Sequence, residues 1–291
     1  MFNNGTGNCS KLAAGTLGVQ CLSPRLNLIS AMRVLTIICA FLALCSGVGA
    51  PRCEAAEETI SIAAAADLVF CLDELSAAFE KAHPGVKLQV TSGSSGNFFA
   101  QIQHGAPFDI FLSADITYPK QLAEAGFADK NSLLTYAVGR LVLWTMKPEI
   151  DVQKGLAVLK DPAVRKIAIA NPEHAPYGRA AKAALEHENL WDALQPKIVL
   201  GENIAQTMQF VQSGNADVGL IALSLVRAPK LAGQGSYFEI PESFHLRLEQ
   251  AGVLTKRGAE KAVAQAFMQY LGSPEARPIL DRYGFLLPAG H

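Results

Sequence analysis

Cysteine is nearly absent from most of this 291-residue sequence. Five of the six cysteines lie within the first 56 residues, and only Cys71 follows them. A single cysteine excludes an internal disulfide over residues 57–291, so stability there has to come from a buried core. Half of the residues are hydrophobic, and the chain is long enough to bury such a core in one large domain or two ordinary ones.

Positive charge is scarce as well. The formal net charge is −1, and no run rich in Lys or Arg occurs, which argues against a nucleic-acid-binding surface. No Lys or Arg lies between Leu88 and Lys120, so an anion bound there would need neutral donors. The histidines form neither an H-x-x-x-H pattern nor a Cys/His pair, which argues against a metal site; they are His83, His104, His174, His187, His245 and His291.

The first 56 residues differ from the rest, with four basic residues and one acid. Met32 and Arg33 precede an apolar run over residues 34–44, which is typical of a secretory signal and short for a membrane-spanning helix. We predict a leader over residues 1–56, with the signal from Met32 to a cleavage site near Ala56 and a start-site extension before it. A lipoprotein signal at Cys45 is a weaker alternative, because Leu44 is large. The predicted location is the periplasm.

The remainder alternates strand-like and helix-like segments, which favours an α/β fold of mostly parallel sheets flanked by helices. Residues 59–66, 86–90 and 108–114 each read as a strand followed by a helix, and the pattern restarts with strands at 139–146, 166–171 and 218–223. We expect two lobes with a ligand cleft between them. The first comprises residues 57–140 plus 245–291, whose tail packs back on it, and the second comprises residues 141–244.

Three turns follow the first three strands, at Asp67, at Ser95 and Gly96, and at Asp115. The carboxyl ends of parallel strands share one edge of a sheet, where open α/β sheets bind ligands. Asp67 and Asp115 are expected to cap the helices that follow them. The remaining acids are expected on solvated faces.

The segment Gly93-Ser94-Ser95-Gly96 can be interpreted in three ways. Free N–H groups at a helix start favour an anion, but a strand–helix turn with a serine N-cap has the same sequence. The third reading, a serine hydrolase using Ser94 or Ser95 with His174, lacks the G-x-S-x-G spacing, because Asn97 stands where Gly is needed. The Gly-Lys-Ser/Thr ending of a phosphate-binding loop is also missing.

Two segments of the second lobe could close on a ligand. Residues 172–178 are rich in Pro and Gly and precede a helix, so they read as a tight connection or as a loop that brings Tyr177 to the cleft. Ile204 opens another helix after Glu202 and Asn203, and its N–H is free to bind an anion.

Taken together, these segments resemble the periplasmic molybdate-binding proteins, the receptors of molybdate ABC importers. The resemblance runs from about residue 59 to 286 and rests on six motifs in order, at residues 64–68, 93–96, 105–115, 171–178, 202–204 and 282–285. It implies a type II periplasmic binding protein fold and a monomeric receptor that is not an enzyme and has no cofactor. Such a receptor takes molybdate or tungstate between its lobes and delivers it to an ABC permease of the inner membrane.

The resemblance also implies a set of ligand contacts. The family's first contact, commonly serine or asparagine, falls on Asp67, with the N–H of Ala66 as its alternative. The second falls on Ser95, beside Ser94. The third falls on Tyr177, and the fourth, a backbone N–H, falls on Ile204. These groups would contact the oxygens of the oxyanion and would not ligate the metal.

Two positions depart from the family's pattern. A tyrosine that some members place after the strand at residues 218–221 is Ala222 here, so Tyr177 is expected to supply the hydroxyl. The Asp67 carboxylate would repel a dianion, so we expect this side chain to cap its own helix and face away. A receptor for sulfate, phosphate or another oxyanion is the alternative function.

Overall fold

The computed structural model describes residues 57–288. The predicted leader over residues 1–56, with Met32, Cys45 and the cleavage site, lies outside the described residues. The fold presented here belongs to the unit Ala55–His291. None of the helices in residues 57–288 has both the length and the apolar character needed to span a membrane.

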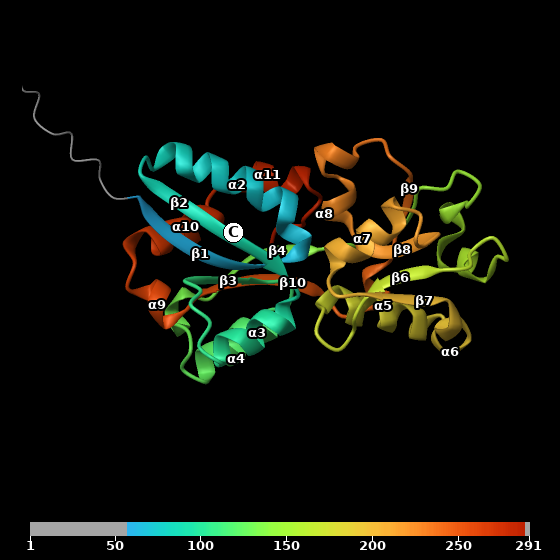
Figure 1. Cartoon of the computed structure of the whole chain (residues 1–291), viewed down its shortest axis with the longest axis horizontal. Helices are drawn as coiled ribbons and strands as arrows, with labels where there is room; N and C mark the ends of the chain where they lie inside the picture. Colours follow the sequence, from blue (N-terminus) through green and yellow to red (C-terminus); the bar gives the residue numbers. More distant parts are fainter. Residues whose placement is uncertain (1–56, 289–291) are drawn as a thin grey trace, which may run out of the picture. The chain divides into compact units, whose positions relative to one another are not determined.

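The first lobe is built on a five-stranded mixed sheet (Figure 1). Strand β1 lies between β2 and β3 and is parallel to both, whereas β10 lies between β3 and β4 and is antiparallel to both. In sheet order the strands are β2 (Val86–Gly93), β1 (Glu58–Ala65), β3 (Ile110–Ser113), β10 (Leu248–Leu254) and β4 (Leu134–Gly139).

The second lobe repeats this plan. Strand β6 is parallel to its neighbours β7 and β8, and β5 is antiparallel to β8 and β9. In sheet order the strands are β7 (Ile198–Gly201), β6 (Ile167–Ala170), β8 (Val218–Ala222), β5 (Leu141–Thr145) and β9 (Ser236–Glu239). The predicted two-lobed α/β fold is confirmed, with both sheets made mixed by their antiparallel strands.

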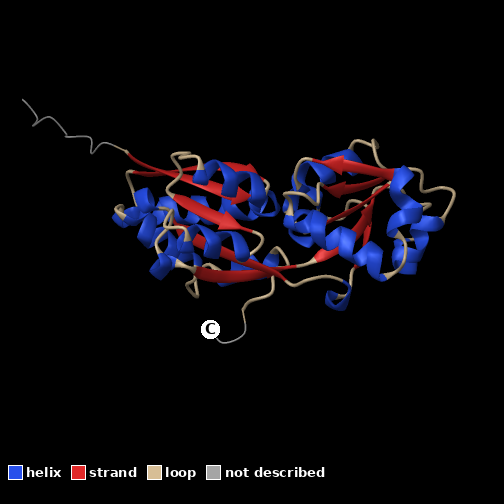
Figure 2. Ribbon diagram, turned by 90° about the horizontal axis from the view of Figure 1, so that it is seen from below, coloured by secondary structure: helices blue, strands red, loops and turns tan. Residues whose placement is uncertain are grey.

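Helices flank both sheets (Figure 2). Those of the first lobe are α2 (Val69–Ala82), α3 (Ser95–Gln103), α4 (Thr117–Glu124), α9 (Lys256–Ala259), α10 (Ala262–Leu271) and α11 (Arg277–Arg282). Those of the second are α5 (Pro176–His187), α6 (Trp191–Leu194), α7 (Ile204–Gln212) and α8 (Leu223–Val226). Short 3₁₀ helices are η1 (Ala66–Leu68), η2 (Lys130–Ser132), η3 (Val152–Lys160), η4 (Gln195–Lys197), η5 (Pro229–Leu231) and η6 (Glu242–Phe244).

Strand β1 shows how the sequence produces the core of the first lobe. Its side chains alternate between the two faces of the sheet, so Ile60 and Ile62 join the core under α2 and α10, while Ala63 joins Phe98 and Phe111 under α3. At its carboxyl end the small Ala65 and Ala66 pack into the core of the second lobe. Small residues at the strand end therefore allow the two lobes to approach closely.

The chain passes between the sheets twice, from β4 to β5 at Arg140 and from β9 to β10 over residues 240–247. The tail contributes a whole strand to the sheet of the first lobe, since β10 begins at Leu248. Two helices follow β10, because α9 ends at Ala259 and α10 begins at Ala262.

Asp109 contradicts the expectation that the remaining acids face solvent. It is fully buried just before β3, and its carboxylate accepts a hydrogen bond from the Ser61 N–H at 2.8 Å. Lys261 Nζ lies 2.8 Å from one carboxylate oxygen, and Arg257 Nε lies 2.9 Å from the other. Asp109 thus ties β1 to the two helices that follow β10.

We expect Asp109→Ala to lower the free energy of unfolding by about 3 kcal/mol, because the Ser61 N–H and the partly buried Lys261 ammonium group lose their acceptor. In a domain of this size the melting temperature should fall by about 6–12 °C, measured by circular dichroism. Asp73→Ala, at an exposed position on α2, is the control and should change stability by less than about 0.5 kcal/mol. Equal melting temperatures for the two variants would show that the Asp109 pairs contribute nothing.

Candidate functional site

One small cavity brings together all six residues that the sequence indicates as ligand contacts. It lies where the carboxyl ends of β1, β2 and β3 meet the starts of α5 and α7, and its volume is about 10 Å³, roughly enough for one water molecule. Its lining residues are Ala65, Ala66, Asp67, Gly93, Ser94, Ser95, Ala114, Ala175, Pro176, Tyr177 and Ile204. Both lobes therefore contribute to it, and its role in ligand binding stays a prediction.

The serine turn supplies hydroxyl and N–H donors. Ser94 occupies the N-cap position of α3, but its side chain makes no capping hydrogen bond, and its hydroxyl is buried without a partner among the described residues. The Ser95 hydroxyl is fully buried and accepts a hydrogen bond from the Ala114 N–H at 3.0 Å, which leaves its own proton available. The serine side chains therefore do not cap α3, and the protons of both hydroxyls remain available.

Gly96 allows the two lobes to touch beside this turn. Its N–H donates to the carbonyl of His174 at 2.9 Å. A Cβ atom at position 96 would lie 2.6 Å from that carbonyl oxygen, so any other residue would push the loops apart. Close approach of the loops thus depends on this glycine.

Helix α7 presents a backbone donor from the second lobe. The Asn203 side chain accepts from the N–H groups of Ala205 and Gln206, each at 3.0 Å. The described residues offer no hydrogen-bond acceptor to the Ile204 N–H. Because that N–H begins the helix, the helix dipole adds to its positive character.

Asp67 is the one acidic side chain of the cavity. One carboxylate oxygen, Oδ2, accepts from Gln250 Nε2 at 2.6 Å and from the Tyr177 hydroxyl at 3.1 Å. The other, Oδ1, is buried without a partner among the described residues. Burial disfavours the charged form and raises the pKa of Asp67 to about 6, although these two hydrogen bonds act in the opposite direction.

The prediction that Asp67 caps its helix was wrong. The residue lies inside η1, whose N-cap is Ala65, and α2 begins after Leu68 without a side-chain cap. Its carbonyl accepts from the Ser224 hydroxyl at 2.7 Å. The side chain points to Gln250 and Tyr177 because these buried groups offer it hydrogen bonds.

Three residues of this network were not among the predicted site residues. Gln250 is fully buried on β10, the Tyr136 hydroxyl donates to its Oε1 at 3.3 Å, and Ser224 reaches across from α8. Gln250 carries a signal in the sequence, because it is a lone amide within the run Leu248–Leu254. Buried polar side chains need partners, so such a position can mark a polar site.

Other polar contacts also join the two lobes. Arg179 pairs with Asp115 at 2.6 Å and donates to the Tyr118 hydroxyl at 2.8 Å. Asn97 donates to Glu202 at 2.6 Å. Asp115 was predicted to cap α4, but the N-cap of that helix is Ile116. The other carboxylate oxygen of Asp115 accepts from the N–H of Thr117, the first residue of α4, at 2.8 Å.

His174 does not form the arrangement that a hydrolase needs. Its Nε2 lies 3.0 Å from the carbonyl oxygen of Glu202 and 3.3 Å from the carboxylate of the same residue. In residues 57–288, no hydrogen bond joins His174 to Ser94 or Ser95. A serine nucleophile without a base in contact is not activated.

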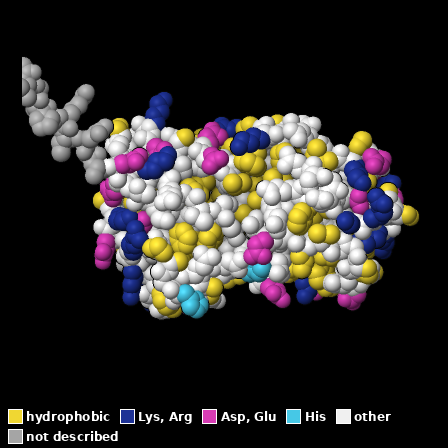
Figure 3. Space-filling view, viewed as in Figure 1, with side chains coloured by type: hydrophobic (Ala, Val, Ile, Leu, Met, Phe, Trp, Pro, Cys, Tyr) yellow, Lys and Arg dark blue, Asp and Glu magenta, His cyan; other side chains and the backbone are white. Residues whose placement is uncertain are grey.

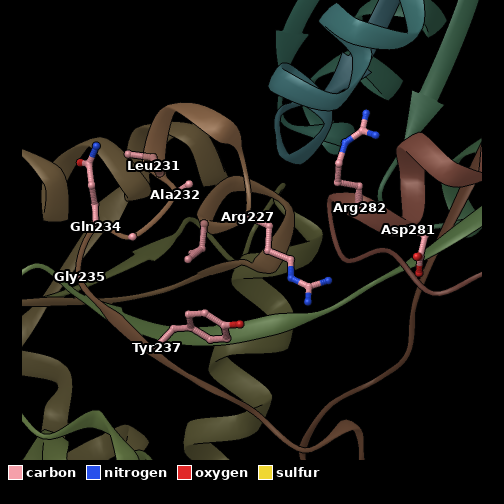
Figure 4. Close-up of a pocket in the computed structure, with 10 residues that line it drawn as sticks. Arg227, Leu231, Ala232, Gln234, Gly235, Tyr237, Asp281 and Arg282 are labelled. Carbon is pink, nitrogen blue, oxygen red and sulfur yellow. The ribbon is translucent and has the colours of Figure 1, made fainter.

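A wider groove of about 490 Å³ lies between α8 and α11 (Figure 4). Arg227, Tyr237 and Arg282 line it, and Arg282 is already paired with Glu74. Two buried side-chain atoms without a hydrogen-bond partner, Asp67 Oδ1 and Ser94 Oγ, belong to residues that line the small cavity. Among the described residues, no such atom belongs to a residue that lines the wider groove. The unpartnered atoms, rather than the volume, identify the candidate site.

The distribution of charged side chains on the surface agrees with the small cavity as the candidate site. On the face shown in Figure 3, Lys and Arg side chains lie mainly toward the outer ends of the two lobes and along the upper edge. The middle of that face shows acidic and histidine side chains among uncharged atoms. No Lys or Arg lines the small cavity, so any anion there would be held by neutral groups.

Comparison with known proteins gives a consistent result. The molybdate-binding protein ModA of Azotobacter vinelandii is 40% identical over 240 residues, which cover 82% of this chain and 94% of that protein. ModA of Rhodobacter capsulatus is 40% identical over 245 residues, 84% of this chain and 94% of that protein. The solved structure of the Azotobacter vinelandii periplasmic molybdate-binding protein aligns with a TM-score of 0.74 at 38% identity, over 79% of this chain and 99% of that one.

The family model described as bacterial extracellular solute-binding protein matches residues 60–286. That range includes every lining residue of the cavity and all of both sheets except the first two residues of β1. The resemblance to molybdate receptors that the motifs indicated is confirmed by relatives that align along nearly their whole length. The chain belongs to the bacterial extracellular solute-binding protein family, together with ModA.

Proposed function

We propose that this protein is a periplasmic receptor that binds molybdate between its lobes and delivers it to an ABC permease of the inner membrane. The observation that carries the proposal is the cavity itself, where unpartnered donors from both lobes meet. The similarity to ModA at 40% identity supports molybdate as the ligand. The protein is not an enzyme and needs no cofactor.

Neutral donors are sufficient for an oxyanion in this setting. The Ser94 and Ser95 hydroxyls and the Ile204 N–H can each donate to a ligand oxygen, and α3 and α7 direct their N-termini at the cavity. Hydrogen bonds to an ionised acceptor are about twice as strong as neutral ones, and a low dielectric strengthens them further. Tyr177 adds a hydroxyl from α5 once its bond to Asp67 is released.

Binding requires the lobes to move. A cavity of about 10 Å³ has no room for four oxygens around a central atom, so the contacts of Tyr177 and Ser224 with Asp67 have to loosen as ligand enters. The contact of Asn97 with Glu202 and the pair of Arg179 with Asp115 re-form when the second lobe closes. This opening and closing is hinge motion between two rigid lobes.

The size of the closed shell provides the first basis for selectivity. Molybdate and tungstate are tetrahedral dianions of nearly equal size, so we propose that both bind. Sulfate is smaller and would leave donors in the shell unpaired, which weakens its binding. A receptor for sulfate or phosphate is the second candidate function, and a direct comparison of ligands tests it.

We propose that the receptor is monomeric and reaches the periplasm through a cleaved signal within residues 1–56. The family description as extracellular solute-binding proteins supports export. Export also agrees with the single cysteine of the described residues, Cys71, which is buried and free.

Titration with molybdate should give a saturable change in tryptophan fluorescence with one site per chain, because closing the lobes alters the surroundings of Trp191 or Trp144. Calorimetry provides a second readout. We expect sulfate to bind at least about a hundredfold more weakly, a difference of about 2.7 kcal/mol. Absence of saturable binding of both molybdate and tungstate would refute the proposal, and tighter binding of sulfate or phosphate would favour the second candidate.

Ile204→Pro removes one backbone donor and retains the helix. Proline is favoured at the first position of a helix, and the extended Asn203 before it (φ −149°, ψ 176°) suits a following proline. Loss of one charge-assisted hydrogen bond should weaken molybdate binding about 10- to 100-fold, measured by calorimetry. Ile204→Ala also shortens the side chain but keeps the N–H, so it should bind at least about tenfold more tightly than Ile204→Pro. Equal affinities would exclude the Ile204 N–H as a contact.

A further inference from the structure

The cavity contains two unpartnered atoms of opposite hydrogen-bonding character. The Ser94 hydroxyl can donate, and Asp67 Oδ1, when ionised, can only accept. An oxyanion without a proton offers acceptors alone. Such a ligand satisfies Ser94 and the backbone N–H groups but leaves the Asp67 oxygen facing another anion.

Asp67 has no positively charged partner in the part of the chain that the structure describes. In residues 57–288 its carboxylate takes part in no ion pair, and its partners are the neutral side chains of Gln250 and Tyr177. The residue is 1% exposed, so water does not screen it. A dianion and an ionised Asp67 in the same shell would repel each other strongly.

The groups that face Asp67 from neighbouring elements do not titrate near neutral pH. Tyr177 on α5, Tyr136 on β4 and Cys71 on α2 are buried, and desolvation raises the pKa of each well above neutrality. On α2, Asp73 is exposed and Glu74 pairs with Arg282. Helices α7 and α8, which pack near Asp67, carry no ionisable residue. Strand β2 carries one, Lys87, which is exposed and pairs with Glu80.

We propose that the site takes up its oxyanion together with one proton, which is held between Asp67 Oδ1 and a ligand oxygen. The inference rests on the proposed function, because it concerns the same cavity. The proton comes from a hydronium ion or a buffer acid, whose bond to that hydrogen breaks as one O–H bond forms between the Asp67 carboxyl group and the ligand; no other covalent bond changes. Oδ2 keeps its hydrogen bond from Gln250, which holds the carboxyl group in place.

This arrangement gives Asp67 a role in choosing the ligand. A shared proton makes a stronger hydrogen bond when the ligand oxygen is more basic, so a weakly basic oxyanion such as sulfate gains less from it. Selectivity then depends on the basicity of the ligand as well as on its size. The pKa of Asp67 of about 6 places the proton within reach at neutral pH.

The test is the number of protons bound with molybdate. Calorimetry at pH 8, in buffers with different ionisation enthalpies and at micromolar ligand, measures this number directly. We expect an uptake of about one proton, and an affinity that falls about tenfold per pH unit between pH 7 and 8.5, as linkage requires. Molybdate binding with no proton uptake and constant affinity would overturn the inference and leave the proposed function standing. No binding at any pH would refute the proposed function.

Three variants identify the group responsible. Asp67→Asn and Asp67→Ser keep a polar side chain without a titratable proton, so both should bind molybdate without proton uptake and with affinities that do not change with pH. Asp73→Asn, the same change at an exposed position, should keep the pH dependence of the unmodified protein. Proton uptake that persists in both Asp67 variants would place the proton elsewhere and reject the role of Asp67.

Unfolding without ligand gives an independent prediction. The pKa of Asp67 is about 6 in the folded protein against an ordinary value of 3.8, so the folded state holds the proton more tightly and loses stability as pH rises from about 4 to 6. Asp67→Asn does not carry this charge. The melting temperature of the variant minus that of the unmodified protein should therefore increase by about 5 °C between pH 4 and pH 6 and stay constant at higher pH. A difference independent of pH would show that the carboxylate is not destabilised by burial.

Discussion

The proposed ligand site depends on one constraint, which is that an anion has to be held away from water without a cation. Backbone N–H groups at helix starts meet this constraint, because the first turn of a helix leaves them unpaired. Three strands of the first sheet end at Ala65, Gly93 and Ser113, and the helices that follow begin at one edge. The second lobe adds the starts of α5 and α7. Alanine, glycine and serine at these ends leave room for the two lobes to meet.

Closure of the lobes relies on several contacts that are weak individually. The Arg179–Asp115 pair is partly exposed, with side chains 38% and 25% accessible, and such pairs contribute roughly 0–1 kcal/mol. Asn97 and Glu202 form another exposed contact. A closed form held mainly by such contacts can open readily, so a ligand that pairs the buried donors can determine which form predominates.

The sequence predicted those parts of the site that depend on local structure. The serine turn and Ile204 could be placed because a strand end, a cap and a helix start lie within a few residues of one another. The capping role predicted for Asp67 was wrong because the direction of its side chain depends on two distant residues. These are Gln250, which is 183 residues away in the sequence, and Tyr177 from the other lobe. The buried Asp109 was missed for the same reason, since its partners are Arg257 on α9 and Lys261, the N-cap of α10, which both follow β10. Local patterns identify donors and caps, but they do not show which distant side chains meet in the fold.

Magnitudes explain why a proton accompanies a dianion here. Two unit charges 4 Å apart interact by about 4 kcal/mol at an effective dielectric constant of 20, and a dianion doubles this. Protonating a group with a pKa of about 6 costs roughly 1.4 kcal/mol at pH 7. Sharing a proton is therefore cheaper than holding two anions side by side, and it stays so until the pH rises by several units. A buried carboxyl next to an oxyanion is consequently compatible with tight binding, provided that the proton is counted as part of the ligand.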